Sequence, residues 1–143
     1  STGTGNTVLS TSPTLVTPVL GTPTSGTLTN CTLPFEGVTY DINAQTGTTY
    51  TFVLADAGDI VTSSNGATVA MTIPPNSSVA FPIGSSITVI SIGAGLTNFA
   101  QGAGVTITST GATASAPVLR IQHSSATAIK TATDTWRVVG DIA

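Results

Sequence analysis

The sequence predicts an all-β protein, and three observations support this prediction. Of its 143 residues, 44 are Thr or Ser, and only nine are charged, three Lys or Arg against six Asp or Glu. Thr is β-branched and fits a pleated sheet, whereas the helix formers Leu, Glu and Lys are scarce. Short apolar runs recur roughly every ten residues between Gly, Pro and Asn breaks. We therefore expect an antiparallel β-sandwich or jelly-roll-like domain of about nine or ten short strands.

An extended Thr/Pro-rich arm, residues 1–34, precedes this domain. Four prolines interrupt it, so it cannot form the regular ladder of an interior strand. Apolar pairs between the prolines need burial, which the same arm of a neighbouring subunit or the body of the domain would provide. The residues expected to make this assembly contact are Val8, Leu9, Leu15, Val16, Val19 and Leu20. A disordered Thr/Pro linker is the alternative.

A connector, residues 35–47, is expected to lead into the C-terminal β domain, residues 48–143. Asp56 to Asp59 are expected to form a turn, and Asn65-Gly66 a tight hairpin. The predicted strands are, in order, 50–54, 60–62, 68–73, 78–81, 87–92, 96–99, 105–108, 118–123, 126–130 and 135–139. Residues 87–92 carry apolar side chains on both faces, which predicts a strand covered on both sides. No fixed period that would indicate a solenoid is visible.

The composition excludes several classes of function. The three cations, all between residues 120 and 137, cannot make the basic stripe that binding to nucleic acid needs. No apolar run approaches the roughly 20 residues that would insert in a membrane. The single Cys31 excludes an intrachain disulfide and a Cys-rich zinc site. No catalytic constellation or cofactor motif is present, so we expect a protein that is not an enzyme and has no cofactor.

A few side chains remain as candidates for binding. His123 is expected to be a hydrogen-bonded interior or interface residue, although three copies on a three-fold axis would form a metal site. Trp136, Tyr50 and Tyr40 could stack on a sugar ring, but burial of Trp136 against the core is the favoured interpretation. The pair Asp56 and Asp59 is better explained as turn residues than as a catalytic or calcium-binding pair.

Two parts of the chain resemble structural proteins of tailed bacteriophages. Residues 14–32, from Thr14 through the Pro18 and Pro23 repeats to Thr32, are similar to a linker that recurs in phage tail-fibre and virion proteins. The runs at 54–58, 73–84, 93–95, 102–107 and 131–136 are similar, in that order, to a terminal β domain of such fibres and virion surface proteins. The resemblance implies a trimeric virion protein that binds a host or capsid surface, and it implies no catalytic residue.

The residues and the resemblance together predict a non-enzymatic virion structural protein, assembled in the bacterial cytoplasm. The first hypothesis is a homotrimeric fibre module that attaches to a host-cell glycan or protein and contacts other virion proteins. A capsid decoration or cement protein, whose arm clamps capsid subunits, is one alternative, and a carbohydrate-binding module is another. The low charge suits a large, self-complementary contact between copies.

Overall fold

The computed structural model of the chain describes residues 39–110 and 116–143. The chain divides between Pro34 and Phe35, and every described residue belongs to the unit Phe35–Ala143. The described elements are β1 (Ile42–Gln45), β2 (Thr49–Thr51), the 3-10 helix η2 (Leu54–Asp56), β3 (Ile60–Ser63), β4 (Val69–Ile73), β5 (Ser86–Ser91), β6 (Thr97–Gln101), β7 (Thr106–Thr108), β8 (Ser125–Ala132) and β9 (Thr135–Gly140). The all-β prediction is confirmed. The arm and its six apolar assembly residues lie outside the described part.

The strands form two sheets, and most neighbouring strands run parallel. The six-stranded sheet has the order β1-β3-β5-β8-β9-β7, and the three-stranded sheet has the order β2-β4-β6. Up to β6 the strands alternate between the two sheets, so each returns beside the strand two positions earlier and parallel to it. The expected antiparallel sandwich is therefore wrong in its pairing, because the turns join strands of opposite sheets instead of making hairpins.

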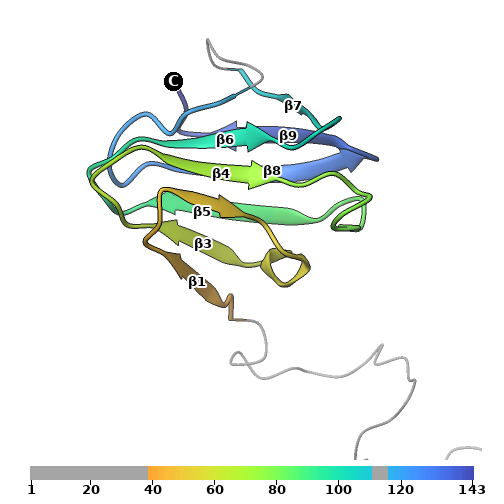
Figure 1. Ribbon diagram of the computed structural model, residues 1–143, viewed down its shortest axis with the longest axis horizontal. Helices are drawn as coiled ribbons and strands as arrows, with labels where there is room; N and C mark the ends of the chain where they lie inside the picture. Colours follow the sequence, from red (N-terminus) through yellow and green to blue (C-terminus); the bar gives the residue numbers. More distant parts are fainter. Residues whose placement is uncertain (1–38, 111–115) are drawn as a thin grey trace, which may run out of the picture. The chain divides into compact units, whose positions relative to one another are not determined.

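This arrangement is a short stack of three coils, each with one strand in each sheet (Figure 1). Paired residues of the second and third coils are 28 positions apart in both sheets, as in Ser63 beside Ser91 and Val69 beside Thr97. Between the first and second coils the offsets are 18 and 21, as in Gln45 beside Ser63 and Thr49 beside Ala70. The solenoid-like stack that the sequence did not predict is thus present without a fixed period.

The corner that contains Asn65-Gly66 connects β3 to β4 in the other sheet, so the predicted hairpin there is wrong. The corner of the third coil, which contains Gly95, lies directly against this corner. A Cβ added to Gly95 would collide with the backbone carbonyl of Ala67, so only glycine allows these corners to stack. The Gly95 N–H donates to the Asn65 carbonyl at 2.8 Å. Inside the corner the hydroxyls of Ser63 and Thr97 are hydrogen-bonded at 2.6 Å.

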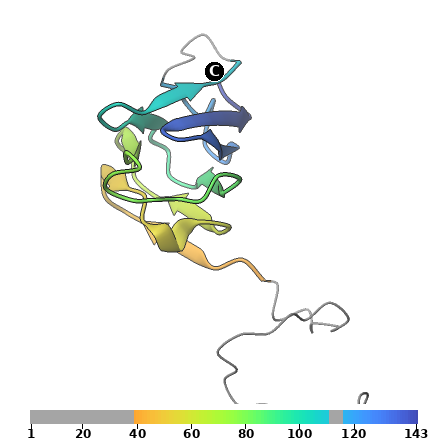
Figure 2. The same cartoon turned by 90° about the vertical axis from the view of Figure 1, so that its right-hand side faces the viewer.

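The hydrophobic core lies between the two sheets, which Figure 2 shows from the side. Alternate residues point inward, as the buried positions of β4, β5 and β6 show. The largest core side chains are Trp136, Phe52, Phe99, Met71, Ile73, Ile87, Ile107 and Leu119. Burial of these side chains is the main stabilising contribution to the fold.

The end of the domain that follows the coils contains the two antiparallel pairs of the sheet, beside one parallel pair of β7 and β9. β8 runs antiparallel to β5 and to β9, with an irregularity between Lys130 and Ala132, and β7 completes the sheet beside β9. At the opposite edge lies β1, part of the segment 35–47 that was expected to be a connector.

Two predicted strands are absent from the described residues. Residues 78–81 lie in the loop between β4 and β5, which Pro74, Pro75 and Pro82 hold out of a ladder. Residues 118–123 make only isolated bridges, between Asn98 and Val118 and between Leu119 and Ile142. Within 39–110 and 116–143 no helix has the length and apolar character needed to span a membrane.

Candidate functional site

The side of the six-stranded sheet that faces away from the core carries almost no charge. Pairing places one row of side chains across this surface, which we call the outer face: Ile42, Ile60, Thr88, Thr127 and Val139. The neighbouring row consists of Ala44, Thr62, Ile90 and Ser125.

One charged side chain, Arg137, points outward from the described strands of this sheet. Its Nη1 donates to the Thr108 hydroxyl at 3.3 Å. Lys130 belongs to the same sheet but lies on its buried side. The outer face is therefore a flat surface of Ile, Val, Ala, Ser and Thr.

Several apolar side chains of the outer face are open to solvent. Ile42 is 67% exposed and Val139 is 49% exposed, while Ile60 and Ile90 are half-buried. Within the described residues β5 is therefore covered by the core on one side only, whereas the sequence predicted cover on both. Ile42 and Ile60 are cross-strand neighbours, and Thr88 and Thr127 lie between them and Val139. Neighbouring exposed apolar side chains on a surface with so little charge are typical of a contact with another molecule.

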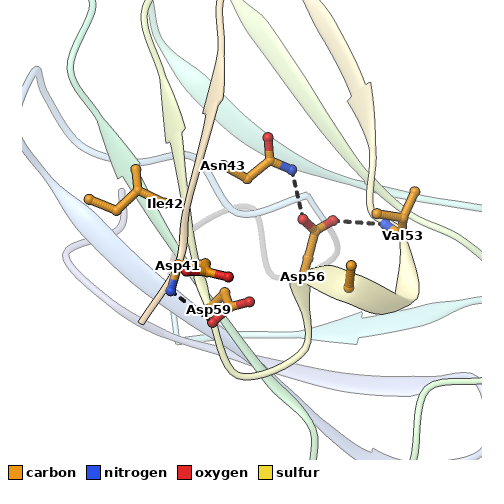
Figure 3. A pocket seen from close by; sticks show the side chains of 7 residues that line it. Asp41, Ile42, Asn43, Val53, Asp56 and Asp59 are labelled. Atoms are coloured by element: carbon orange, nitrogen blue, oxygen red, sulfur yellow. Dashed lines mark hydrogen bonds between the residues drawn. The ribbon is translucent and has the colours of Figure 1, made fainter. Parts of the chain in front are cut away.

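The first coil ends in a hollow of about 220 Å³, shown in Figure 3. β1 contributes Ile42 and Asn43 to it, and the segment around η2 contributes Val53, Ala55 and Asp56. Asp41 and Asp59 complete the lining. Polar and acidic groups thus lie at the end of the core where no further coil is stacked in the described structure.

Asp56 is the centre of a hydrogen-bond network at this hollow. It is only 2% exposed, and both carboxylate oxygens accept hydrogen bonds. Oδ1 accepts from Asn43 Nδ2 at 2.8 Å, and Oδ2 accepts from the Tyr50 hydroxyl at 2.9 Å and the Val53 N–H at 2.8 Å (Figure 3). Asn43 Oδ1 in turn accepts from Gln45 Nε2 at 2.6 Å. The predicted turn from Asp56 to Asp59 is present, since the Asp59 N–H donates to the Asp56 carbonyl at 3.2 Å. The Asp56 side chain is in addition a buried hub that joins β1, β2 and η2.

The network changes the acidity of one group. Burial, then the hydrogen bond to Asp56 and the negative charge of Asp56, raise the pKa of Tyr50, against a smaller lowering by Asn43. Asp59 has a separate role, since its Oδ1 accepts the Asp41 N–H at 3.1 Å. The two carboxylates therefore hold different segments of backbone, which is a structural use of both.

No group of three or more His, Cys, Asp or Glu side chains in the described residues is arranged to hold a metal ion. His123 lies in an exposed turn with φ 70°, where its N–H donates to the Ser91 carbonyl at 2.7 Å. Of the two positions expected for His123, interior or interface, the interior one is wrong, because residues 121–124 turn outward instead of continuing a strand.

The three aromatic candidates lie apart and differ in exposure. Trp136 is 1% exposed and packs edge-on against Phe81 at 5.4 Å, so its face is not open to a sugar ring. The Tyr50 hydroxyl is held by Asp56, and Tyr40 is 67% exposed. Burial of Trp136 is as the sequence predicted, and the structure brings no two of these rings together as a platform.

A second ion-pair and hydroxyl network fixes the last residues of the chain. Asp141 accepts from Arg120 Nη2 at 2.6 Å and from the Ser124 hydroxyl at 2.6 Å. The hydrogen bond from Ser124 is the main cause that lowers the pKa of Asp141, and Arg120 lowers it further. This cluster holds the turn before β8 against the residues after β9.

Comparison of the chain with protein-family models, with curated proteins and with solved structures finds no match.

Proposed function

We propose that this chain is a non-enzymatic structural module of a tailed-phage virion that assembles as a homotrimer and serves in attachment to the host surface. The outer face is the observation that carries this proposal, since it presents Ile42, Ile60, Ile90 and Val139 with one charge, Arg137, at its margin. Covering such a surface with a second copy removes apolar area from water, which stabilises the assembly.

The resemblance of residues 14–32 and of the later runs to phage fibre proteins supports this class of assembly. The stack of coils supports the same class, because a fibre requires a domain that can continue along one axis. In the described structure β1 is an edge strand of the six-stranded sheet, and the antiparallel end lies opposite (Figure 1). A chain of this form suits a terminal fibre module whose attachment is strengthened by several copies.

The test is the mass of the purified chain in solution, measured by light scattering, together with one matched pair of variants. Ile42→Lys places a charge on the outer face, and Ile83→Lys places one in the loop between β4 and β5. Both side chains are 67% exposed, so neither change removes core packing. We expect three chains per particle for the wild type and Ile83→Lys, and single chains for Ile42→Lys. A monomeric wild type would refute the proposed assembly.

Attachment is tested separately with fluorescently labelled protein. We expect binding to host cells and none to emptied capsids. If the protein binds only to capsids, the proposed function in host attachment is wrong and capsid decoration takes its place. The expected trimer would be unaffected by that result.

A further inference from the structure

Lys130 is a buried cation whose amine donates hydrogen bonds to two neutral groups. It points from β8 to the core side of the sheet and is 2% exposed. Its Nζ donates to the Asn76 side-chain oxygen at 2.5 Å and to the Phe81 carbonyl at 2.7 Å. The one ion pair among the described residues is elsewhere, between Arg120 and Asp141. A lysine this deeply buried is normally paired with a carboxylate, so its contact with a carboxamide requires an explanation.

A carboxylate lies next to this pair without contacting the amine in a salt bridge. Asp134, in the turn between β8 and β9, accepts the Asn76 backbone N–H on Oδ1 at 2.6 Å. The Asp134 carbonyl also accepts the Thr106 N–H at 2.8 Å, which fixes the turn. Asp134 has φ 54°, a left-handed conformation in which Asp and Asn are the favoured residues after glycine. Three segments thus bring an amine, a carboxamide and a carboxylate together.

Aromatic side chains enclose the same place. Trp136 lies opposite Lys130 in the β8–β9 register, and its ring packs edge-on against Phe81. Both rings are buried, with exposed fractions of 1% and 3%. These rings shield the amine from water on its core side, while Asn76 and Asp134 are half-buried.

We propose that Lys130 and Asn76 are a modification site at which the chain forms an intramolecular isopeptide bond. Lys130 Nζ attacks Asn76 Cγ, a C–N bond forms between them, and the bond from Cγ to Nδ2 breaks. The lysine nitrogen loses two protons, one before the attack and one from the tetrahedral intermediate, and the Asp134 carboxylate passes both in turn to the leaving nitrogen. One ammonium ion leaves, so atoms and charge balance and no oxidant or reductant is needed. Proximity and a fixed orientation supply most of the rate in a reaction between such weak partners.

The bond would join residues 54 positions apart. It would fasten the proline-containing loop between β4 and β5 to the antiparallel end of the domain. A covalent link of this kind restricts the unfolded chain and resists extension by force, as a disulfide does, but it cannot be reduced.

The test is tryptic digestion of the 143-residue chain after unfolding in urea, followed by mass spectrometry. Trypsin has only three sites, Arg120, Lys130 and Arg137, and it does not cleave at an acylated lysine. We expect residues 1–120 to be recovered covalently joined to 121–137, with an intact mass one ammonia below that of the sequence. Free peptides 121–130 and 131–137 in the wild type would refute the bond. This readout also excludes a cyclic imide at Asn76, which loses ammonia but leaves Lys130 cleavable.

Three variants test the assigned roles. Lys130→Arg and Asn76→Ala remove the nucleophile and the electrophile, and we expect the mass deficit and the joined peptide to disappear in both. Asp134→Asn preserves the shape and the left-handed backbone, and we expect cross-linking about a hundredfold slower than in the wild type. Unchanged cross-linking in Asp134→Asn would refute the role of that carboxylate, and a joined peptide in Asn76→Ala would refute Asn76 as the partner.

Discussion

The two ends of the β domain close one core with different chemistry. At the first coil the core ends in hydrogen bonds among Asn43, Tyr50 and Asp56, beside a hollow that is open to solvent. At the antiparallel end it is covered by buried apolar side chains, Trp136 and Val138, with Lys130 drawn in beside them. The first end is therefore held by hydrogen bonds to the carboxylate of Asp56, whereas the second end is closed by the packing of buried apolar side chains.

This difference follows from how parallel and antiparallel strands end. A stack of parallel coils always has an end coil with no further coil against it. The polar groups at that end must therefore hydrogen-bond to one another or to water. The antiparallel β8–β9 pair reverses the chain and covers its own end. The first end therefore depends on hydrogen bonds, whereas the second and third coils are held together by the stacking of their corners.

Gly95→Ala tests the stacking of the coils, and we expect the largest effect there. Its Cβ would meet the Ala67 backbone, which cannot move aside as a side chain can. We expect a loss of about 3 kcal/mol in the free energy of unfolding, typical of severe overpacking. Urea denaturation monitored by circular dichroism measures it.

Gly66→Ala is the matched control in the corner beneath. A Cβ at Gly66 has no atom within 4 Å, and its φ is not in the left-handed region. We expect no loss of stability from this change. Equal destabilisation by the two substitutions would show that the coils are not stacked at this corner.

The strands and the all-β class could be predicted from the sequence because they depend on local alternation and β-branched residues. The pairing could not, because it depends on whether a corner such as Asn65-Gly66 reverses the chain or carries it to the other sheet. The coils repeat in geometry with few repeated residues: Val61 and Ser63 recur as Val89 and Ser91, but most other positions differ. A search for a period therefore finds none.

The site was harder to predict than the fold. Asp56 was interpreted as a turn residue from its neighbours Ala57 and Gly58, and its partners Asn43 and Tyr50 lie on two other strands. One feature of the sequence indicated that Lys130 is buried. Ala126, Ala128 and Lys130 are alternate residues of one strand, so their side chains lie on the same, inward face. That alternation alone places a charged side chain in the core, but its pairing with Asn76 depends on tertiary structure.

Asp56→Asn tests the hydrogen bonds of the first end. The substitution keeps the size of the side chain but replaces one acceptor by a donor, which cannot accept from Tyr50 and Val53. We expect a loss of about 2 kcal/mol in the free energy of unfolding. Asp59→Asn is the control, because Asp59 accepts one exposed N–H, and about 0.5 kcal/mol is expected there. A smaller loss for Asp56→Asn than for Asp59→Asn would show that the network does not hold the first coil.

Tyr50→Phe tests the same network through its dependence on pH, with the smallest effect. The raised pKa means that the Tyr50 phenol keeps its proton in the folded protein at a pH where the unfolded chain begins to lose it. Its contribution is therefore complete below the ordinary tyrosine pKa of about 10, and it is lost as the pH rises through the folded value.

At neutral pH the wild type should exceed Tyr50→Phe by about 1.5 kcal/mol in the free energy of unfolding, the lower end of the contribution of a hydrogen bond to a charged acceptor. This difference should narrow in urea denaturation at a pH above about 10. Tyr40→Phe, at a side chain that is 67% exposed, should change stability by less than about 0.5 kcal/mol at either pH. A difference between the wild type and Tyr50→Phe that grows with pH would mean that the network favours the ionised phenol. That outcome would contradict the geometry in which the Tyr50 hydroxyl donates to the Asp56 carboxylate.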